Sequence, residues 1–139
     1  MDCHLEFHHI GIACRDIDKT SRFYVDQGYT PSPVIEDHLL RVRVCFMELA
    51  GQPRLELLEP LDEQSPVTRT LEKTGVTPYH ICYEVQDIEA AIASLRSSHR
   101  FLLVKGPVPA CAMEDRRVAF MYQKNTGLIE LVEAKAALL

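Results

Sequence analysis

Two stretches of the chain, residues 7–14 and 78–85, are apolar and rich in residues that favour strands. An aspartate, Asp16 or Asp87, follows each stretch and stands one residue before an isoleucine. Because aspartate is a favoured helix N-cap, the pattern predicts a strand followed directly by a helix at both places. The second helix has a clear apolar face, formed by residues at helical spacing: Ile88, Ala91, Ile92 and Leu95.

Three further β-prone segments follow each of these strand–helix pairs. They predict strands at residues 30–35, 40–49 and 54–59 in the first half, and at 102–108, 117–123 and 128–133 in the second. Turn-forming residues at 50–53 and 125–127 separate the last two strands of each half. Residues 65–75 are predicted as a linker helix between the halves.

The chain contains an internal repeat. Residues 9–17 (HIGIACRDI) and 80–88 (HICYEVQDI) share His, Ile, Asp and Ile at an offset of 71. An offset of 74 aligns RVCFM at 43–47 with RVAFM at 117–121, and LELLE at 55–59 with IELVE at 129–133. One offset that holds across two separate segments indicates a duplicated unit. We therefore expect an α+β fold, a single domain over 1–139 whose two βαβββ modules, about 6–60 and 77–134, form a concave mixed sheet.

Composition and charge narrow the possible functions. Hydrophobic residues make up 47% and charged residues 25%, which is typical of a globular protein. A net charge of −5 without a basic stripe argues against a nucleic-acid partner. No apolar stretch approaches the ~20 residues of a membrane span, and the first residues lack the pattern of a secretory signal. Five cysteines without a CxxC pair are typical of reduced thiols, so we expect a cytoplasmic protein.

Strand alternation places four polar side chains on one face of the expected sheet. His9 and His80 alternate with apolar residues in the opening strands, and Glu56 and Glu130 alternate with apolar residues in the last strands. Two imidazole nitrogens and two carboxylate oxygens are suitable ligands for a divalent metal ion. Because both halves carry the same residue types at equivalent positions, we predict a central metal site formed by these four side chains, in a cleft between the halves.

The remaining histidines and two further glutamates have simpler interpretations. By the same alternation His8 is expected on the helix-facing side, in a structural role. His4, His38 and His99 are expected to be solvated, and Glu59 and Glu133 to be surface charges at strand ends.

Four segments, FHHIGIACRDI, RLELLEPLDEQSPVTRTLEKTG, YHICYEVQDIEAAI and VAFMYQKNTGLIELVE, cover nearly the whole chain in order. They resemble the vicinal oxygen chelate (glyoxalase/bleomycin resistance/dioxygenase) superfamily, and most of all its methylmalonyl-CoA epimerase branch. The resemblance implies a metal bound by His9, Glu56, His80 and Glu130, the same four residues that the repeat indicates. It also implies a homodimer and a small-molecule substrate such as an acyl-CoA thioester.

Epimerases of this branch carry a second catalytic carboxylate just before the strand that corresponds to residues 42–47. Leu39 stands at the matching position of this chain, while Glu36 and Asp37 lie a few residues upstream. The candidate proton-transferring carboxylates are therefore Glu130 and Glu56, with Glu36 or Asp37 as a second base.

The expected function is that of a metal-dependent isomerase or epimerase that transfers a proton beside a carbonyl. A divalent ion (Co, Mn, Ni or Zn) would bind two neighbouring substrate oxygens and stabilise the enolate. The alternatives are a lactoylglutathione lyase-like enzyme, a protein that tailors or confers resistance to a small molecule, and a non-enzymatic binding module. Tight ligand binding by the metal-free protein would favour the binding module, whereas proton exchange restored by metal would favour the enzyme.

Overall fold

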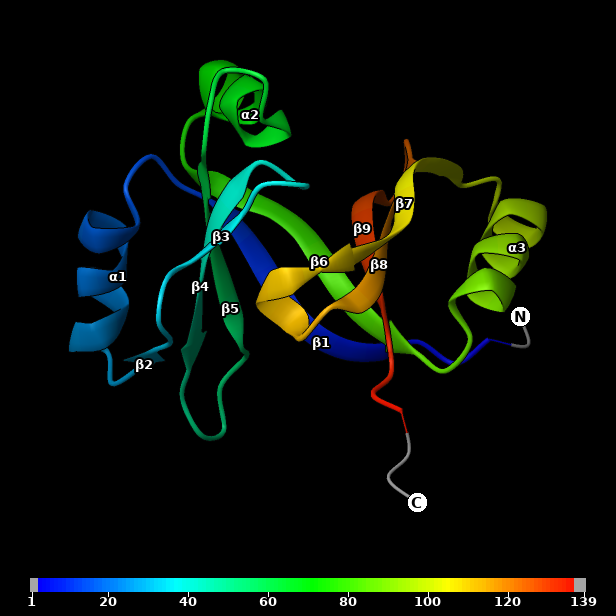
Figure 1. Cartoon of the computed structure of the whole chain (residues 1–139), viewed down its shortest axis with the longest axis horizontal. Coiled ribbons are helices and arrows are strands. Elements are labelled where there is room, and N and C mark those ends of the chain that lie inside the picture. Colours follow the sequence, from blue (N-terminus) through cyan, green and yellow to red (C-terminus); the bar gives the residue numbers. More distant parts are fainter. Residues whose placement is uncertain (1–2, 137–139) are drawn as a thin grey trace. The chain divides into compact units, whose positions relative to one another are not determined.

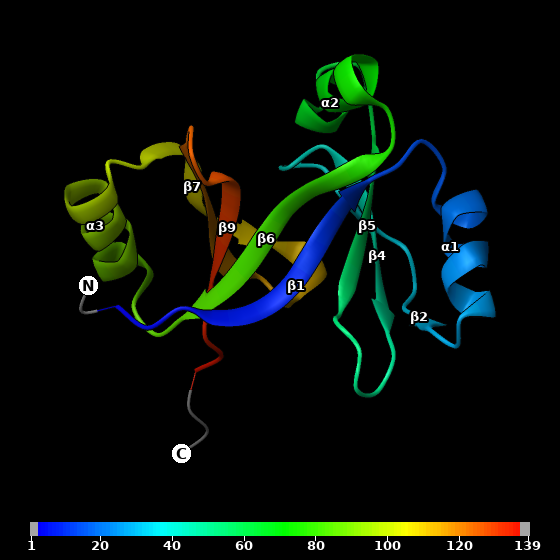
Figure 2. The same ribbon diagram turned by 180° about the vertical axis from the view of Figure 1, so that it is seen from behind.

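The computed structural model describes residues 3–136 of the chain. These residues form nine strands, three α-helices and one short 3-10 helix, η1 (Cys111–Met113), as Figures 1 and 2 show. The chain divides into two compact units, residues 9–79 and residues 80–136 with 3–8. The divisions fall inside β1 (Glu6–Ala13) and β6 (Thr77–Val85), so each of these strands contributes residues to both units.

The unit of residues 9–79 contains a mixed sheet with α1 (Ile17–Asp26) on one face. Its other strands are β2 (Thr30–Pro31), β3 (Ile35–Asp37), β4 (Val42–Glu48) and β5 (Leu55–Pro60). β5 is parallel to β1 and antiparallel to β4, which also pairs with β2 and β3. α1 stands beside β4 and β5 in Figure 1. The apolar cluster of this unit comprises Ile12, Cys14, Ile17, Cys45, Met47, Leu55 and Leu57.

The other unit repeats this arrangement with α3 (Ile88–His99) as its helix. Its strand order is β6, β9 (Gly127–Glu133), β8 (Arg116–Gln123) and β7 (Leu102–Ala110). β6 and β9 are parallel, and the remaining pairs are antiparallel. Its buried cluster joins α3 to the sheet through Ile88, Ala91, Ile92, Leu95, Ala119, Met121, Ile129 and Leu131, among others. The predicted βαβββ repeat and the α+β fold are confirmed.

Both repeat helices begin at the predicted aspartates. The Asp16 carboxylate accepts a hydrogen bond from the backbone N–H of Lys19 at 3.0 Å. The Asp87 carboxylate accepts one from the N–H of Ala90, also at 3.0 Å. Each bond satisfies an N–H that has no partner inside the helix, which explains why each helix starts one residue after its aspartate.

The expected strand at residues 30–35 is instead two short strands, β2 and β3, separated by residues 32–34. Pro31 and Pro33 have no backbone N–H to donate to a neighbouring strand, so continuous pairing is not possible here. The Ser32 hydroxyl accepts a hydrogen bond from the backbone N–H of Phe46 at 2.9 Å. The backbone N–H of Ser32 still donates to the Phe46 carbonyl at 2.8 Å, so the hydroxyl replaces only the second bond of this pairing.

The predicted linker helix is α2 (Pro66–Thr74), which belongs to the unit of residues 9–79. The Ser65 hydroxyl accepts a hydrogen bond from the N–H of Val67 at 3.3 Å. Gly75, with a φ of 82°, ends the helix in a backbone conformation that favours glycine. The description of the chain as a single domain of modules 6–60 and 77–134 stays a prediction.

Glu59 and Glu133 lie at strand ends, as expected, but each is only partly exposed and pairs with an arginine. The Glu59 side chain is 15% exposed and accepts hydrogen bonds from the Ile17 N–H at 2.9 Å and from Arg43 at 2.7 Å. Glu133 occupies the equivalent position of the repeat and accepts a hydrogen bond from Arg117 at 2.8 Å. Arg43 and Arg117 are also related by the repeat, so the duplication preserves an arginine–glutamate pair in each unit.

Glu133→Gln is expected to lower the free energy of unfolding by about 1 kcal/mol at pH 7 and by less in acid. Arg117 lowers the pKa of the Glu133 carboxyl, mainly through its side-chain hydrogen bond. The folded state therefore favours the charged carboxylate. This stabilisation is present above the ordinary glutamate pKa of 4.5 and is lost as pH falls through the lowered folded value.

Urea unfolding of the two proteins at pH 7 and at several values below 4.5 measures this difference. Glu72→Gln, at an exposed position of α2, serves as the control and should change stability little at any pH. A wild-type advantage over Glu133→Gln that stays constant into acid would contradict the assignment.

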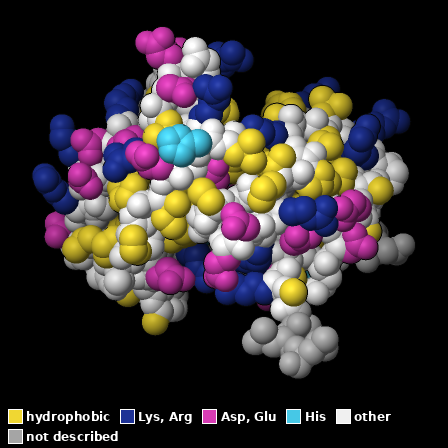
Figure 3. All heavy atoms as spheres, viewed as in Figure 1, with side chains coloured by type: hydrophobic (Ala, Val, Ile, Leu, Met, Phe, Trp, Pro, Cys, Tyr) yellow, Lys and Arg dark blue, Asp and Glu magenta, His cyan; other side chains and the backbone are white. Residues whose placement is uncertain are grey.

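Acidic and basic side chains lie beside one another at several places on the face drawn in Figure 3. Arg54 pairs with Glu48 at 2.7 Å, and Arg41 pairs with Asp62 at 3.0 Å. Such pairs offset positive charge locally. Within residues 3–136, no helix combines the length and the apolar character needed to cross a bilayer.

Candidate metal and active site

His9 on β1 and Glu56 on β5 form a buried pair in the unit of residues 9–79. Gly11 lies opposite Glu56 in the parallel strands, and His9, two residues earlier, takes the same face. His9 Nε2 lies 3.1 Å from Glu56 Oε1, and the two side chains are 0% and 4% exposed. Leu55 and Leu57, on either side of Glu56, point to the opposite face and belong to the cluster under α1.

His80 on β6 and Glu130 on β9 form the equivalent pair in the other unit. Cys82 lies opposite Glu130, and His80 is again two residues earlier on the strand. His80 Nε2 lies 3.1 Å from Glu130 Oε1, and the side chains are 1% and 3% exposed. Ile129 and Leu131 pack in the α3 cluster on the other face. The repeat thus produces two buried histidine–glutamate pairs of the same construction.

A phenylalanine contacts the histidine of each pair. Phe46 lies opposite Glu56 across β4 and β5, and its ring meets the His9 ring edge-on at a centroid distance of 5.4 Å. Phe120 lies opposite Glu130, and its ring meets the His80 ring edge-on at 5.8 Å. Both contacts restrict the orientation of the imidazole rings. Sequence reasoning did not single out these residues, although RVCFM and RVAFM display them at the offset of 74.

The donor chemistry of the pairs fits a divalent metal ion. His9, Glu56, His80 and Glu130 are all residue types that could hold one. Neutral imidazole nitrogen and carboxylate oxygen together suit Co, Mn, Ni or Zn. A buried carboxylate needs a compensating positive charge, and a bound cation would provide it.

The candidates for a second base lie on different faces of the β3–β4 hairpin. Glu36 pairs in register with Arg43 and is 53% exposed, with its carboxylate 3.8 Å from Arg43 Nε. Asp37 pairs with Val42, and the register through β4 to β5 puts it on the same face as Glu56. Asp37 is buried, and its Oδ1 accepts a hydrogen bond from the Leu40 N–H at 2.9 Å. Leu39 is half exposed in the turn.

Two buried cysteines, Cys14 after β1 and Cys45 on β4, stay protonated near neutral pH. Burial raises the pKa of the Cys14 thiol to about 11 and also raises that of Cys45. Because the thiolate is the nucleophile and the metal ligand, a thiol with a raised pKa does neither well. Both side chains belong to the apolar cluster under α1, and their role there is packing.

Of the other histidines, His8 directly precedes His9 on β1 and belongs with His9 and Cys82 to a second group of potential metal ligands. His8 is half-buried, with its Nε2 3.4 Å from Arg116 Nη2. His4, His38 and His99 are exposed, and none of them belongs to a group of potential metal ligands within residues 3–136.

Residues 8–120 match the family described as the Glyoxalase/Bleomycin resistance protein/Dioxygenase superfamily. The chain is 34% identical over 132 residues to the mitochondrial methylmalonyl-CoA epimerase of Mus musculus, an alignment that covers 91% of this chain and 72% of that protein. It is 35% identical over 132 residues to the ethylmalonyl-CoA/methylmalonyl-CoA epimerase of Cereibacter sphaeroides, with 89% and 94% covered.

A solved structure has a closely similar fold. A variant of the Streptomyces coelicolor methylmalonyl-CoA epimerase in complex with 2-nitronate-propionyl-CoA superposes with a TM-score of 0.81. The two sequences are 29% identical, and the match covers 96% of this chain and all of that one. The sequence comparison and the fold comparison therefore both find similarity to methylmalonyl-CoA epimerases.

Proposed function

Because the chain belongs to the glyoxalase/bleomycin resistance protein/dioxygenase superfamily, we propose that it is an epimerase of 2-substituted acyl-CoA thioesters. The observation that carries this proposal is the pair of buried histidine–glutamate contacts, one on the equivalent strands of each repeat. The names of the similar enzymes support the reaction and the thioester class.

We propose that His9, Glu56, His80 and Glu130 together hold one divalent ion. Donor type, burial and the internal repeat support this grouping. When bound, such an ion would draw electron density from the substrate carbonyl oxygen. The side chains themselves supply the ligand atoms and the proton-accepting oxygen.

The proposed reaction moves one proton at the carbon beside the thioester carbonyl. The proton passes to a carboxylate oxygen, and the electron pair of the C–H bond moves into the carbonyl to form an enolate. Return of a proton to the other face of that carbon gives the epimer. We assign the proton-accepting role to Glu130, with Glu56 as its equivalent in the other repeat.

Asp37 is better placed than Glu36 to serve as a second base. It shares a face of the sheet with Glu56, whereas Glu36 lies beside Arg43 on the opposite face. Phe46 and Phe120 would limit the access of water to the reacting carbon, which strengthens the electrostatic interactions around it. A homodimer and a cytoplasmic location stay predictions.

Deuterium uptake from heavy water tests the proposed function. The metal-loaded protein is expected to exchange the proton at carbon 2 of methylmalonyl-CoA and ethylmalonyl-CoA, as followed by mass spectrometry. Uptake only into 2-hydroxycarbonyl compounds or glutathione adducts would favour the lyase alternative. No uptake into any of these, together with tight ligand binding by the metal-free protein, would favour a binding module.

A further inference from the structure

The second group of potential metal ligands differs from the first because it contains a thiol. It consists of His8, His9 and Cys82. His8 and Cys82 belong to the same unit of the fold, and their ligand atoms lie within 4.8 Å of each other. Cys82 is fully buried and His8 is half-buried. Thiolate and imidazole ligands together are typical of sites for zinc and other thiophilic ions.

This group lies where the two repeats differ from each other. Cys82 stands opposite Glu130 across β6 and β9, on the same face of the sheet. The equivalent position of the other unit is Gly11, which stands opposite the glutamate of that unit and has no side chain. The equivalent of His8, at the offset of 71, is Tyr79. The thiol and the additional imidazole therefore occur in one repeat only, and the duplication does not account for them.

Arg116 lowers the affinity of this group for a cation. Its Nη2 lies 3.4 Å from His8 Nε2, and because a guanidinium can only donate, that imidazole nitrogen is the acceptor. Arg116 also pairs with Glu84 at 2.9 Å, and its side chain is only 12% exposed. An ion that binds His8 must therefore displace this contact or lie close to the positive charge of the guanidinium. We expect a weak site that fills only when the ion is in excess.

We propose that His8, His9 and Cys82 form a low-affinity site for a thiophilic divalent ion, and that an ion bound there inhibits the enzyme. The inhibition rests on the proposed function, because His9 is also one of the four ligands of the proposed catalytic ion. A neutral imidazole has one acceptor nitrogen and ligates one ion, so the two sites exclude each other. An excess of a thiophilic ion would withdraw His9 from the ion that supports proton transfer. Manganese, which prefers oxygen ligands, would not do so.

Titration of the manganese-loaded full chain with cadmium tests this site without any turnover. Cadmium is thiophilic, and a bond between cadmium and a thiolate produces an ultraviolet charge-transfer band. In the wild type this band is expected to grow as cadmium is added in excess. Cys82→Ser and Cys82→Ala should lack the band. Cys111→Ser is the control and should keep it, because Cys111 is exposed and outside the group.

The neighbouring charges should change the cadmium affinity in opposite directions. Arg116→Gln removes the positive charge and releases His8, so the midpoint of the band should move to a cadmium concentration about two- to fivefold lower. Glu84→Gln leaves the charge of Arg116 without its partner and should raise the midpoint by a similar factor. His8→Ala removes a ligand and should raise the midpoint by at least about tenfold.

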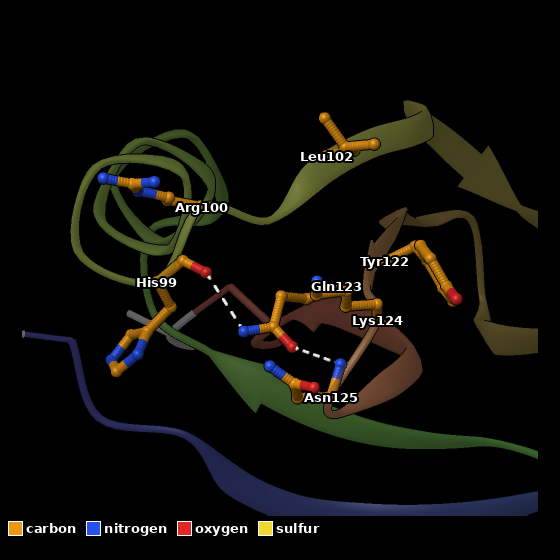
Figure 4. A pocket seen from close by; sticks show the side chains of 7 residues that line it. All are labelled: His99, Arg100, Leu102, Tyr122, Gln123, Lys124 and Asn125. Atoms are coloured by element: carbon orange, nitrogen blue, oxygen red, sulfur yellow. Dashed lines mark hydrogen bonds between the residues drawn. The ribbon is translucent and has the colours of Figure 1, made fainter.

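His99→Ala is the control for His8→Ala and should leave the midpoint of the band unchanged. His99 ends α3 and lines a hollow of about 390 Å³ beside the β8–β9 hairpin (Figure 4). Its backbone carbonyl accepts a hydrogen bond from the Gln123 side chain at 3.4 Å. Among residues 3–136, neither a cysteine nor an acidic residue lines this hollow, so it lacks the donors that a thiophilic ion requires.

Absence of the band in the wild type would overturn the proposed site, and so would a band that survives in both Cys82 variants. Deuterium exchange in the same samples tests the inhibition: the exchange supported by manganese should fall as the band grows. Growth of the band without loss of exchange would overturn the shared use of His9. A wild type that shows the band but has no exchange with manganese alone would contradict the epimerase function and leave the site standing.

Discussion

Glu130→Gln is expected to reduce deuterium exchange into methylmalonyl-CoA by about 100- to 10,000-fold, the usual contribution of a general base. The amide keeps the size of the side chain and one oxygen donor, but it has neither the negative charge nor the basicity of the carboxylate. If Glu130 both holds metal and accepts the proton, excess metal should refill the site without restoring exchange. The measurement is the exchange rate at saturating metal.

Glu133→Gln provides the matched control for this variant. It makes the same chemical change three residues further along β9, where the side chain pairs with Arg117. Exchange at pH 7 should remain near the wild-type rate despite the small loss of stability. If excess metal restores exchange in Glu130→Gln, Glu130 acts only as a metal ligand. If Glu130→Gln is fully active without added metal, the proton-accepting residue is Glu56 or Asp37 instead.

His80→Ala is expected to remove bound divalent metal from the purified protein. Changes to residues that only support a metal ligand already weaken binding by about 10- to 100-fold, and loss of a ligand itself should weaken it further. Loss of the imidazole also leaves the buried Glu130 carboxylate without its neighbour at 3.1 Å. Elemental analysis after dialysis gives the metal content per chain.

His99→Ala is the control for the metal measurement, because His99 is exposed at the end of α3. It should retain the metal content of the wild type. His9→Ala should lose metal as His80→Ala does if the two pairs form one site. Loss of half the metal in each single variant would show instead that each pair binds its own ion.

The repeat made both histidine–glutamate pairs predictable from sequence. Strand alternation predicted the face of Glu56 and Glu130, because each is flanked by apolar residues that pack under a helix. The repeat of a histidine at equivalent positions of the opening strands singled out His9 and His80. The N-caps were predictable from local sequence as well, since an aspartate stands shortly after each opening strand and one residue before an isoleucine. These features depend on local sequence, and a duplicated pattern strengthens each of them.

Side-chain contacts that depend on the register between neighbouring strands could not be predicted from strand alternation and the repeat alone. Glu59 and Glu133 lie at strand ends, where solvation is the ordinary expectation, and only the register shows that Arg43 and Arg117 stand beside them. The roles of Phe46 and Phe120 likewise depend on which residues oppose Glu56 and Glu130. The break between β2 and β3 was visible in principle, because Pro31 and Pro33 within three residues argue against a continuous strand.

Titration of the chelated, metal-free protein with a divalent ion tests the proposed joint metal site and its role in proton transfer together. Deuterium exchange into methylmalonyl-CoA should be absent without metal and should rise in proportion to added ion until one equivalent per chain is bound. Full exchange in the metal-free protein would contradict the proposal, and so would a rise that ends only at two equivalents.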